Sequence, residues 1–323
     1  MQILAIIGAG QLGSRHLQAL ANISQPFTIY VVDPQEQALQ TTKQRFEEID
    51  NPVKKDVYYV NTIENIPERL DLVIVATNSV NRRAVIEEFL ASKKIRYLIL
   101  EKFLFPALSD YEAVQKLLSA KSVKTWVNCS RRAVTLYKEI AKSIKGTIQF
   151  SVVGSDWGLA CSTIHFLDLF SVLSSSDSYQ VAFSHIDDNI QASKRQGYIE
   201  FTGSLHVTGN NGDIFEAVSY KDGSHPVIVK ISSPEEEWII NETKRGYVCL
   251  LKSHEWQPVT GQFNMPLQSE IGATIVKELI ETGDCSLPTY NESQYLHKIL
   301  LELFVDKFNT LSKIENGETC LIT

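Results

Sequence analysis

A chain of 323 residues, 44% hydrophobic and 21% charged, has the composition of a soluble globular protein and enough length for two domains with sizeable cores. Its 31 basic and 38 acidic residues give a net charge of −7 without a basic cluster, which argues against nucleic acid and anionic membranes as partners. No basic leader or long apolar stretch indicates export or membrane insertion, so we expect a cytoplasmic protein.

The first twenty residues predict a strand, a tight turn and a helix. An apolar run at residues 3–7 enters the sequence Gly8-Ala9-Gly10-Gln11-Leu12-Gly13. Gly8 can adopt a backbone conformation closed to other residues, Gly10 leaves room for a pyrophosphate, and Gly13 allows the helix to pack closely on the strand. The free amides at the helix start would then face the phosphates of a dinucleotide.

A second predicted strand, residues 27–32, ends at Asp33, twenty residues after Gly13. A carboxylate at this position would bind the adenosine ribose hydroxyls and disfavour the extra phosphate of NADP. The pattern therefore predicts NAD as the cofactor, with NADP less favoured. The alternatives are a glycine turn without a ligand, or a methyltransferase that uses the same fold for an adenosyl cofactor.

Alternating helices and strands complete a predicted doubly wound α/β domain over residues 1–126. The unbroken apolar run at residues 72–76 suits a parallel strand buried on both faces, and it ends at Thr77-Asn78. The strand at residues 97–100 delivers Glu101-Lys102 to the same carboxyl edge, where doubly wound sheets bind ligands. The other predicted elements are helices at 34–49, 80–92 and 109–118 and strands at 57–60 and 123–127.

The regular alternation of strands and helices then ends, and residues 127–323 predict an α+β domain with a large, mostly antiparallel open sheet. Turns such as Gly209-Asn210-Asn211-Gly212 separate the strands as hairpin connections do. One weakly covered sheet face favours a homodimer or homotetramer. The predicted strands are 147–153, 180–184, 198–208, 214–218, 227–231, 238–240 and 246–251, and the predicted helices are 133–144, 159–173, 267–282 and 292–311.

Five widely spaced cysteines, with no Cys-x-x-Cys pair and no clustered histidines, predict reduced thiols and no metal site.

Four motifs together resemble the Gfo/Idh/MocA oxidoreductases over nearly the whole chain. They are the glycine turn, Ala76-Thr77-Asn78 for the family's Ala-Thr-Pro-Asn, Glu101-Lys102 for its Glu-Lys-Pro, and His165-Phe166-Leu167-Asp168 for the end of its Asp-x-Gly-x-His-x-x-Asp. The resemblance implies an amino-terminal Rossmann domain and an NAD-dependent dehydrogenase or reductase. Its substrate would be a CH–OH or keto carbon of a sugar or nucleotide sugar, with surface-polysaccharide synthesis as one suggested role.

The chain departs from the family pattern at three places. Phe103 follows Lys102 where the family has a proline, often described with a cis bond, and Pro106 lies four residues beyond the lysine. The family's catalytic aspartate falls on Cys161, and its histidine after Ala-Thr-Pro-Asn falls near Arg82. A non-catalytic NAD-binding regulatory protein that kept the fold is therefore the competing hypothesis.

The resemblance assigns catalysis to Lys102 and His165. A cationic nicotinamide and partial shielding from water would favour the neutral amine of Lys102, which could accept the hydroxyl proton. Since Cys161 lies one helical turn before His165, a Cys-His nucleophile is an alternative, but no oxyanion hole supports it. The predicted cofactor residues are Gly8, Gly10, Gln11, Leu12, Gly13, Asp33, Thr77, Asn78, Glu101 and Lys102; the predicted substrate residues are Asn128, Arg131, Arg132, Cys161, His165 and Asp168. Arg131 or Arg132 could hold a phosphate or carboxylate in a bidentate manner, unless they are solvated charges at a helix start.

Overall fold

A computed structural model describes residues 1–49, 53, 55–315 and 317–323. The chain forms two compact units, each built from three segments. The first comprises Met1–Phe105, Ser109–Ser130 and Pro266–Gln294, and the second comprises Pro106–Leu108, Arg131–Met265 and Tyr295–Thr323. The predicted boundary after residue 126 lies near the end of the second segment of the first unit. The return of 266–294 to the first unit differs from the prediction, which placed these residues in the second domain.

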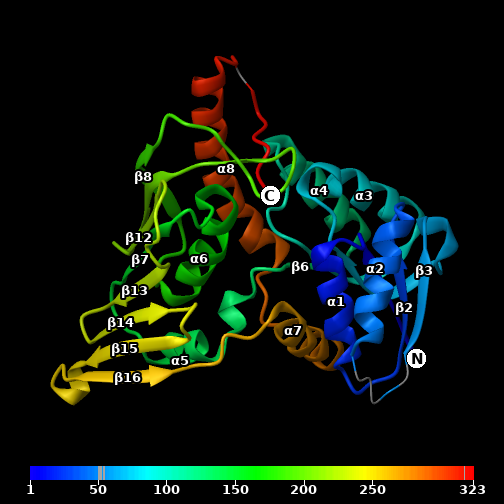
Figure 1. The fold of residues 1–323 in the computed structure, drawn as a ribbon, viewed down its shortest axis with the longest axis horizontal. Helices are drawn as coiled ribbons and strands as arrows, with labels where there is room; N and C mark the ends of the chain where they lie inside the picture. The colour runs from blue at the N-terminus through cyan, green and yellow to red at the C-terminus, as the bar shows by residue number, and fades with distance from the viewer. Residues whose placement is uncertain (50–52, 54, 316) are drawn as a thin grey trace. The chain divides into compact units, whose positions relative to one another are not determined.

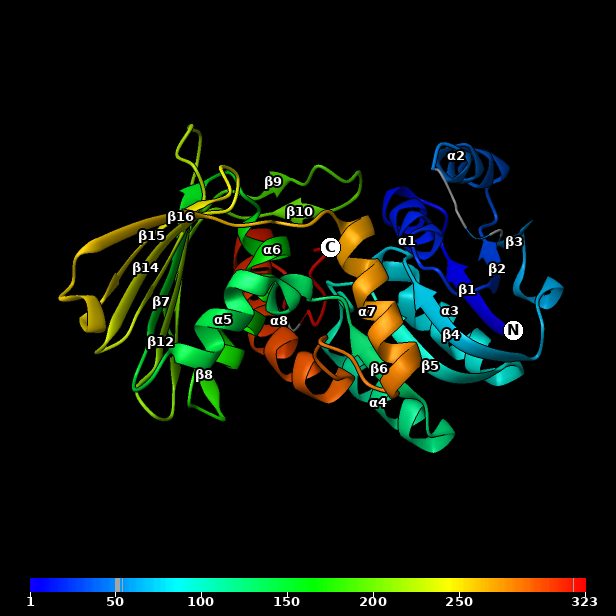
Figure 2. The same ribbon diagram turned by 90° about the horizontal axis from the view of Figure 1, so that it is seen from below.

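The first unit contains a six-stranded parallel sheet in the order β3-β2-β1-β4-β5-β6 (Figure 1; all six strands are labelled in Figure 2). This doubly wound order confirms the predicted Rossmann fold. The strands form where short apolar runs are buried by helices on both faces; Val73 and Leu98, for example, are 0% and 1% exposed. The strands are β1 Gln2–Ile7, β2 Phe27–Val32, β3 Asp56–Val60, β4 Arg69–Val75, β5 Lys94–Leu100 and β6 Lys124–Val127.

Five helices accompany this sheet: α1 Gln11–Ala21, α2 Glu36–Glu47, α3 Ser79–Ser92, α4 Leu108–Lys121 and α7 Gln268–Thr282. Helices α2 and α7 both pack against α1, and Figure 2 shows α7 beside α1. A Cβ built on Gly272 would lie 3.1 Å from the Cβ of Ala19, so glycine at this position permits the close approach of α7. This packing is why α7 belongs with the first unit.

The second unit contains an eight-stranded sheet in the order β16-β15-β14-β13-β7-β12-β11-β8. Only the β7–β12 pair is parallel among the described pairings of this sheet, which confirms the predicted mostly antiparallel architecture. The strands are β7 Gln149–Ser155, β8 Tyr179–Ile186, β11 Gly203–Gly209, β12 Ile214–Tyr220, β13 Ile228–Ser232, β14 Glu236–Asn241, β15 Gly246–Leu251 and β16 Pro258–Gln262. Helices α5 Thr135–Ser143, α6 Leu159–Leu173 and α8 Tyr290–Ser312 accompany them.

The prediction of one continuous strand over residues 198–208 was wrong. The structure has a short strand β10, Ile199–Glu200, paired with β9, Gln191–Ala192, and a separate strand β11. Gly203 has φ +117°, a conformation that interrupts an extended run and that other residues rarely adopt. Strand β16 was not predicted, because its sequence Pro-Val-Thr-Gly-Gln lacks alternating apolar residues.

Helices α5, α6 and α8 lie on one side of this sheet (Figure 2). The core between helix and sheet is aromatic: Phe150 stacks on Phe215 at 5.6 Å, and both contact Phe170 of α6. On the opposite sheet face, the register aligns Phe183 with His206, Glu216, Ser151, Lys230 and Ile239 across six strands. Phe183 is 57% exposed and Ile239 38% exposed.

Asp213, at the start of β12, fixes the loop that follows α6. Its carboxylate is fully buried and accepts hydrogen bonds from the Ile148 amide at 2.7 Å and the hydroxyls of Ser174 and Ser176 at 2.7 and 2.8 Å. Burial alone would raise the pKa of Asp213, but these hydrogen bonds outweigh burial and hold the pKa below its ordinary value.

We expect Asp213 to make folding sensitive to acid. Because its pKa is lower in the folded chain, its stabilisation is present above the unfolded value of about 4 and is lost as the pH falls through the folded value. Asp213→Asn should lower the free energy of unfolding at pH 7 by about 1–3 kcal/mol. It should also make this free energy fall less steeply as the pH is lowered. Urea denaturation across pH measures both effects. Glu302→Gln on α8 is the control, since Glu302 is exposed. If the free energy of unfolding of Asp213→Asn fell with decreasing pH as steeply as that of the unmodified protein, this role of Asp213 would be contradicted.

Candidate cofactor and active site

The glycine turn between β1 and α1 leaves space beside its second glycine. A Cβ on Gly8, which has φ +96°, would lie 3.1 Å from backbone atoms of Ala76 and Thr77, and a Cβ on Gly13 would lie 1.8 Å from the Gly8 carbonyl oxygen. By contrast, no described atom outside the immediate neighbours lies within 4 Å of a Cβ built on Gly10. Gly10 also precedes α1 without a side-chain cap, so the N-cap side chain takes up none of the first-turn amides.

Asp33 lies against this turn. Its carboxylate accepts hydrogen bonds from the Ala9 amide at 2.7 Å and the Gln35 amide at 2.9 Å. The hydroxyl of Thr42 on α2 donates to the Ala9 carbonyl at 2.8 Å and ties α2 to the same turn. Each carboxylate oxygen has a second lone pair, so Asp33 can still accept a bond from a ligand hydroxyl.

Arg45 is a residue that sequence reasoning did not single out. Its guanidinium donates to the Gln11 side chain at 2.9 Å and to the Ser14 hydroxyl at 2.7 Å, so α2 brings a cation to the first turn of α1. No sequence motif reveals this contact, because Arg45 is far from the glycines along the chain and reaches them only when α2 packs on α1.

The loop after β4 presents Thr77 and Asn78. The buried Thr77 hydroxyl has no hydrogen-bond partner among the described residues. Asn78 accepts a hydrogen bond from the Asn81 amide at 3.2 Å and caps α3. A buried hydroxyl in such a position is ordinarily satisfied, so a ligand group at this edge would complete its hydrogen bonding.

Arg82, near the family's histidine position, is fully buried and braces two loops at this edge. Its guanidinium donates to the carbonyl of Thr77 at 2.5 Å, to that of Leu104 at 2.7 Å and to that of Phe103. The loop after β4 and the loop after β5 are therefore fixed to one another through a single side chain. Sequence reasoning noted Arg82 only as a departure from the family.

Glu101 belongs to a buried cluster at the end of β5. Its Oε1 lies 2.6 Å from His16 Nε2 of α1 and accepts from the side-chain Nδ2 of Asn128 at 2.7 Å. The three side chains are no more than 4% exposed. Burial alone would raise the pKa of Glu101, but the hydrogen bond and charge of His16 outweigh burial and lower it. Two predicted site residues, Glu101 and Asn128, are thus brought together.

Lys102 directly follows this cluster and is half-buried. The Lys102–Phe103 peptide bond is cis, at the position where the family has a proline. Buried side chains fix the residues on both sides of Lys102: His16 contacts the Glu101 carboxylate, and Arg82 donates to the Phe103 carbonyl. This arrangement gives the lysine a defined backbone position at the carboxyl edge of the sheet.

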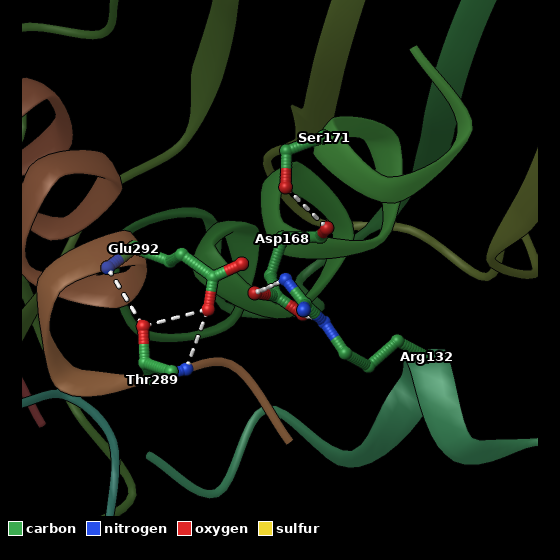
Figure 3. A network of polar contacts seen from close by, with 5 residues as sticks. All are labelled: Arg132, Asp168, Ser171, Thr289 and Glu292. Atoms are coloured by element: carbon green, nitrogen blue, oxygen red, sulfur yellow. Dashed lines mark hydrogen bonds and ion pairs between the residues drawn. The ribbon is translucent and has the colours of Figure 1, made fainter. Parts of the chain in front are cut away.

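In the second unit, helix α6 carries Cys161, His165 and Asp168, and its observed bounds, Leu159–Leu173, equal the predicted ones. Asp168 is 1% exposed and receives two hydrogen bonds from Arg132, at 2.6 and 2.9 Å (Figure 3). His165 is half-buried. Cys161 lies 3.3 Å from the Ser162 hydroxyl and lines a cavity of about 450 Å³.

The two arginines predicted to hold an anion are bound to carboxylates of the second unit. Arg132 pairs with Asp168, and Arg131 pairs with Glu242 through contacts of 3.0 to 3.3 Å. Glu242 also accepts from the Tyr137 hydroxyl at 2.8 Å, and Arg131 lies over the Phe166 ring at 4.1 Å. Both guanidinium groups therefore brace the protein itself.

The first unit fits a dinucleotide. Open space at Gly10, uncapped amides at the start of α1 and the Thr77 hydroxyl together supply donors and room for a pyrophosphate. A parallel sheet of this order with a glycine turn at its first crossover defines a dinucleotide-binding Rossmann domain. Residues 3–129 match the Gfo/Idh/MocA family, described as an oxidoreductase family with an NAD-binding Rossmann fold. Residues 3–129 are therefore similar to the NAD-binding Rossmann domain of that family.

Solved structures share the architecture of nearly the whole chain. An oxidoreductase from Agrobacterium radiobacter in complex with NAD+, L-tartaric acid and magnesium is 15% identical, with a TM-score of 0.69 and coverage of 93% of this chain and 94% of that one. UDP-N-acetylglucosamine 3-dehydrogenase GnnA from Acidithiobacillus ferrooxidans is 12% identical, with a TM-score of 0.70 and coverage of 94% of this chain and 96% of that one. A super-repressor mutant of Gal80p from Saccharomyces cerevisiae is 14% identical, with a TM-score of 0.73 and coverage of 97% of this chain and 98% of that one. At these identities the likeness shows the fold. No curated protein sequence matches the chain significantly.

Proposed function

We propose that this protein is an NAD-dependent dehydrogenase or reductase acting on a CH–OH or keto carbon of a sugar or nucleotide sugar. The observation that supports it best is the fixed backbone around Lys102, at the sheet edge that holds the glycine turn. A cytoplasmic location and a role in surface-polysaccharide synthesis are further parts of the proposal. A nicotinamide-fluorescence screen of free sugars, sugar phosphates and nucleotide sugars tests it, and the absence of turnover with every compound would contradict it.

In this mechanism the glycine turn and Asp33 would hold NAD, which would supply the hydride acceptor for the carbinol carbon. The Lys102 amine takes the hydroxyl proton as the carbon–oxygen bond becomes a carbonyl, and it returns the proton in the reverse direction. His165 hydrogen-bonds the substrate hydroxyl and orients it. An ordinary thiol is mostly protonated at neutral pH, so Cys161 does not replace an ionised aspartate as a partner for His165.

The other site residues have supporting roles in the proposal. Gly8, Gly10, Gln11, Leu12 and Gly13 bind the pyrophosphate, and Asp33 binds the adenosine ribose. Thr77, Asn78 and Glu101 position the nicotinamide half. For Asn128, Arg131, Arg132 and Asp168, substrate contact stays a prediction; their observed partners are protein groups, which favours a role in holding the site rather than touching the substrate.

A second candidate is a non-catalytic NAD-binding regulator. Cys161 at the position of the family's catalytic aspartate favours it, as does a fold shared with a Gal80p super-repressor mutant. Tight NAD binding without turnover of any compound in the same screen would select this candidate.

We expect NAD to bind more tightly than NADP. The Asp33 carboxylate repels a 2′-phosphate and accepts from a ribose hydroxyl, so Asp33→Ala should weaken NAD binding about tenfold and narrow the difference between the cofactors. Calorimetry with both cofactors measures this. The same calorimetry is applied to Arg45→Ala, which removes the cation that α2 brings to the turn. Equal or tighter NADP binding by the unmodified protein would refute the assignment.

We also expect a homodimer or homotetramer that buries the open sheet face of the second unit. Phe183 and Ile239 are apolar and exposed there, while Lys230 and Glu237 form an ion pair at 3.1 Å on the same face. Phe183→Asp with Ile239→Glu should shift the protein toward monomers, as measured by light scattering, with the fold retained. A monomer in the unmodified protein at micromolar concentration would contradict this expectation.

A further inference from the structure

The cavity beside Cys161 has a chemical character that bears on the substrate. It lies wholly in the second unit, at the amino-terminal end of α6, and its lining includes Trp157, Ser162, Gln191 and Ser219. Its volume is about 450 Å³. The indole nitrogen of Trp157 donates to the Val218 carbonyl at 2.8 Å, and the ring meets Phe166 edge-on at 5.6 Å. The indole is therefore held in place as one wall of the cavity.

Ser219 gives this cavity an unused hydrogen-bonding group. The residue is 1% exposed, and its hydroxyl has no hydrogen-bond partner among the residues that the structure describes. Buried hydroxyls ordinarily have a partner, and a hydroxyl can both donate and accept. The Ser162 hydroxyl and the Gln191 amide line the same cavity and offer further neutral donors and acceptors.

The charges around the cavity oppose an anion. Its lining contains the carboxylates of Asp156, Glu200 and Asp222 against the single ammonium of Lys194. The amides at the start of α6, which would otherwise attract an anion, already bind Glu200: its carboxylate accepts from the Ala160 amide at 2.5 Å and from the Cys161 amide at 3.3 Å. Arg131 and Arg132, the cations predicted to bind an anionic substrate, are held by Glu242 and Asp168.

We infer that this cavity takes an uncharged, hydroxyl-rich ring of the substrate and excludes phosphate, carboxylate and nucleotide diphosphate groups. The inference rests on the proposed oxidoreductase function and narrows its substrate class to neutral sugars or polyols. Ser219, Ser162 and Gln191 hydrogen-bond the ring hydroxyls, and Trp157 packs on an apolar face of the ring.

A matched set of ligands tests the inference. NAD-loaded protein is titrated by calorimetry with neutral sugars and inositols, and with the 6-phosphate, uronic acid and uridine-diphosphate form of each sugar. At least one neutral compound should bind, and its charged counterparts should bind at least about tenfold more weakly. Tighter or equal binding of a charged counterpart would overturn the inference, and so would a failure of every neutral compound to bind at millimolar concentration.

Three variants, one of them a control, test whether the cavity causes this selectivity. Ser219→Ala should weaken the neutral ligand about fivefold with an unchanged melting temperature, whereas Ser151→Ala on β7 should not. Asp156→Asn with Asp222→Asn should reduce the discrimination against charged counterparts, and asparagine tolerates the positive φ of both positions. If Ser219→Ala and Ser151→Ala weakened binding of the neutral ligand equally, the cavity would not be its binding site. If the double asparagine variant discriminated against charged counterparts as strongly as the unmodified protein, the cavity carboxylates would not be the cause of the discrimination.

Turnover separates this inference from the proposed function. Binding of a neutral sugar without any change in nicotinamide fluorescence would support the cavity's selectivity and contradict the oxidoreductase. Turnover of a sugar phosphate or nucleotide sugar in preference to its neutral counterpart would support the oxidoreductase and overturn the selectivity.

Discussion

Lys102→Met should abolish turnover while the affinity for NAD changes little. Methionine fills a similar volume but cannot accept or donate a proton, so hydride transfer would leave the hydroxyl proton without a base. Because the backbone of this loop is held by His16 through Glu101 and by Arg82 through Phe103, the substitution should leave the loop in place. Stopped-flow nicotinamide fluorescence measures turnover, and calorimetry measures NAD affinity.

Two variants on α6 test whether His165 orients the substrate hydroxyl and whether Cys161 has any chemical role. His165→Ala should reduce turnover on the order of 10²-fold, since it removes a group that orients the hydroxyl. Cys161→Ser should be mild, because a neutral thiol is replaced by a neutral hydroxyl of similar shape. If Cys161→Ser were as damaging as Lys102→Met, the thiol would have a chemical role and this mechanism would be wrong. A loss of NAD affinity in Lys102→Met comparable with the loss of turnover would point to cofactor binding instead.

His16→Leu should be among the most destabilising single changes in the first unit. It removes the His16 contact of the Glu101 carboxylate, which is 3% exposed, and loss of one partner of a buried carboxylate typically costs about 3–5 kcal/mol. The double variant His16→Leu with Glu101→Leu should cost less than His16→Leu alone, because no buried charge is then left without a partner. Urea denaturation of the unmodified protein, His16→Leu, Glu101→Leu and the double variant measures the coupling.

An exposed ion pair supplies the matched control. Lys94 and Glu68 lie 2.9 Å apart, but their side chains are 68% and 64% exposed, so Lys94→Ala should change stability far less than His16→Leu does. For the buried pair, the loss of stability in the His16→Leu, Glu101→Leu double variant is compared with the sum of the two single losses. Equality of the two would show that His16 and Glu101 do not stabilise the fold as a pair.

The sequence predicted best where local pattern and burial agree. The run Leu72-Val73-Ile74-Val75 is apolar without interruption, and it forms the buried half of β4. Helix α6 was predicted with its observed bounds because an apolar helical stretch follows a glycine, and Gly158 precedes the helix with φ +84°. The glycine turn was predicted with equal success, since the positions of Gly8 and Gly13 follow from backbone sterics within a few residues.

The sequence was less informative about side-chain partners. Arg131 and Arg132 look like free cations at a helix start, but Glu242 and Asp168, which bind them, are far away along the chain. Likewise, nothing near Arg82 in the sequence indicates that it reaches the carbonyls of Phe103 and Leu104. These contacts depend on which helices pack on which strands, which is a tertiary property.

By itself, therefore, the sequence determined the two architectures, the position of the glycine turn and the placement of Asp33 and Lys102 at strand ends. These features depend on local backbone preferences and on the periodicity of burial, which a single chain segment expresses. Only the tertiary structure decided that α7 returns to the first unit, that Arg45 reaches the glycine turn, and that Arg131 and Arg132 pair with carboxylates. Each of these depends on the pairing of charges and shapes between distant segments, and no local pattern encodes that pairing.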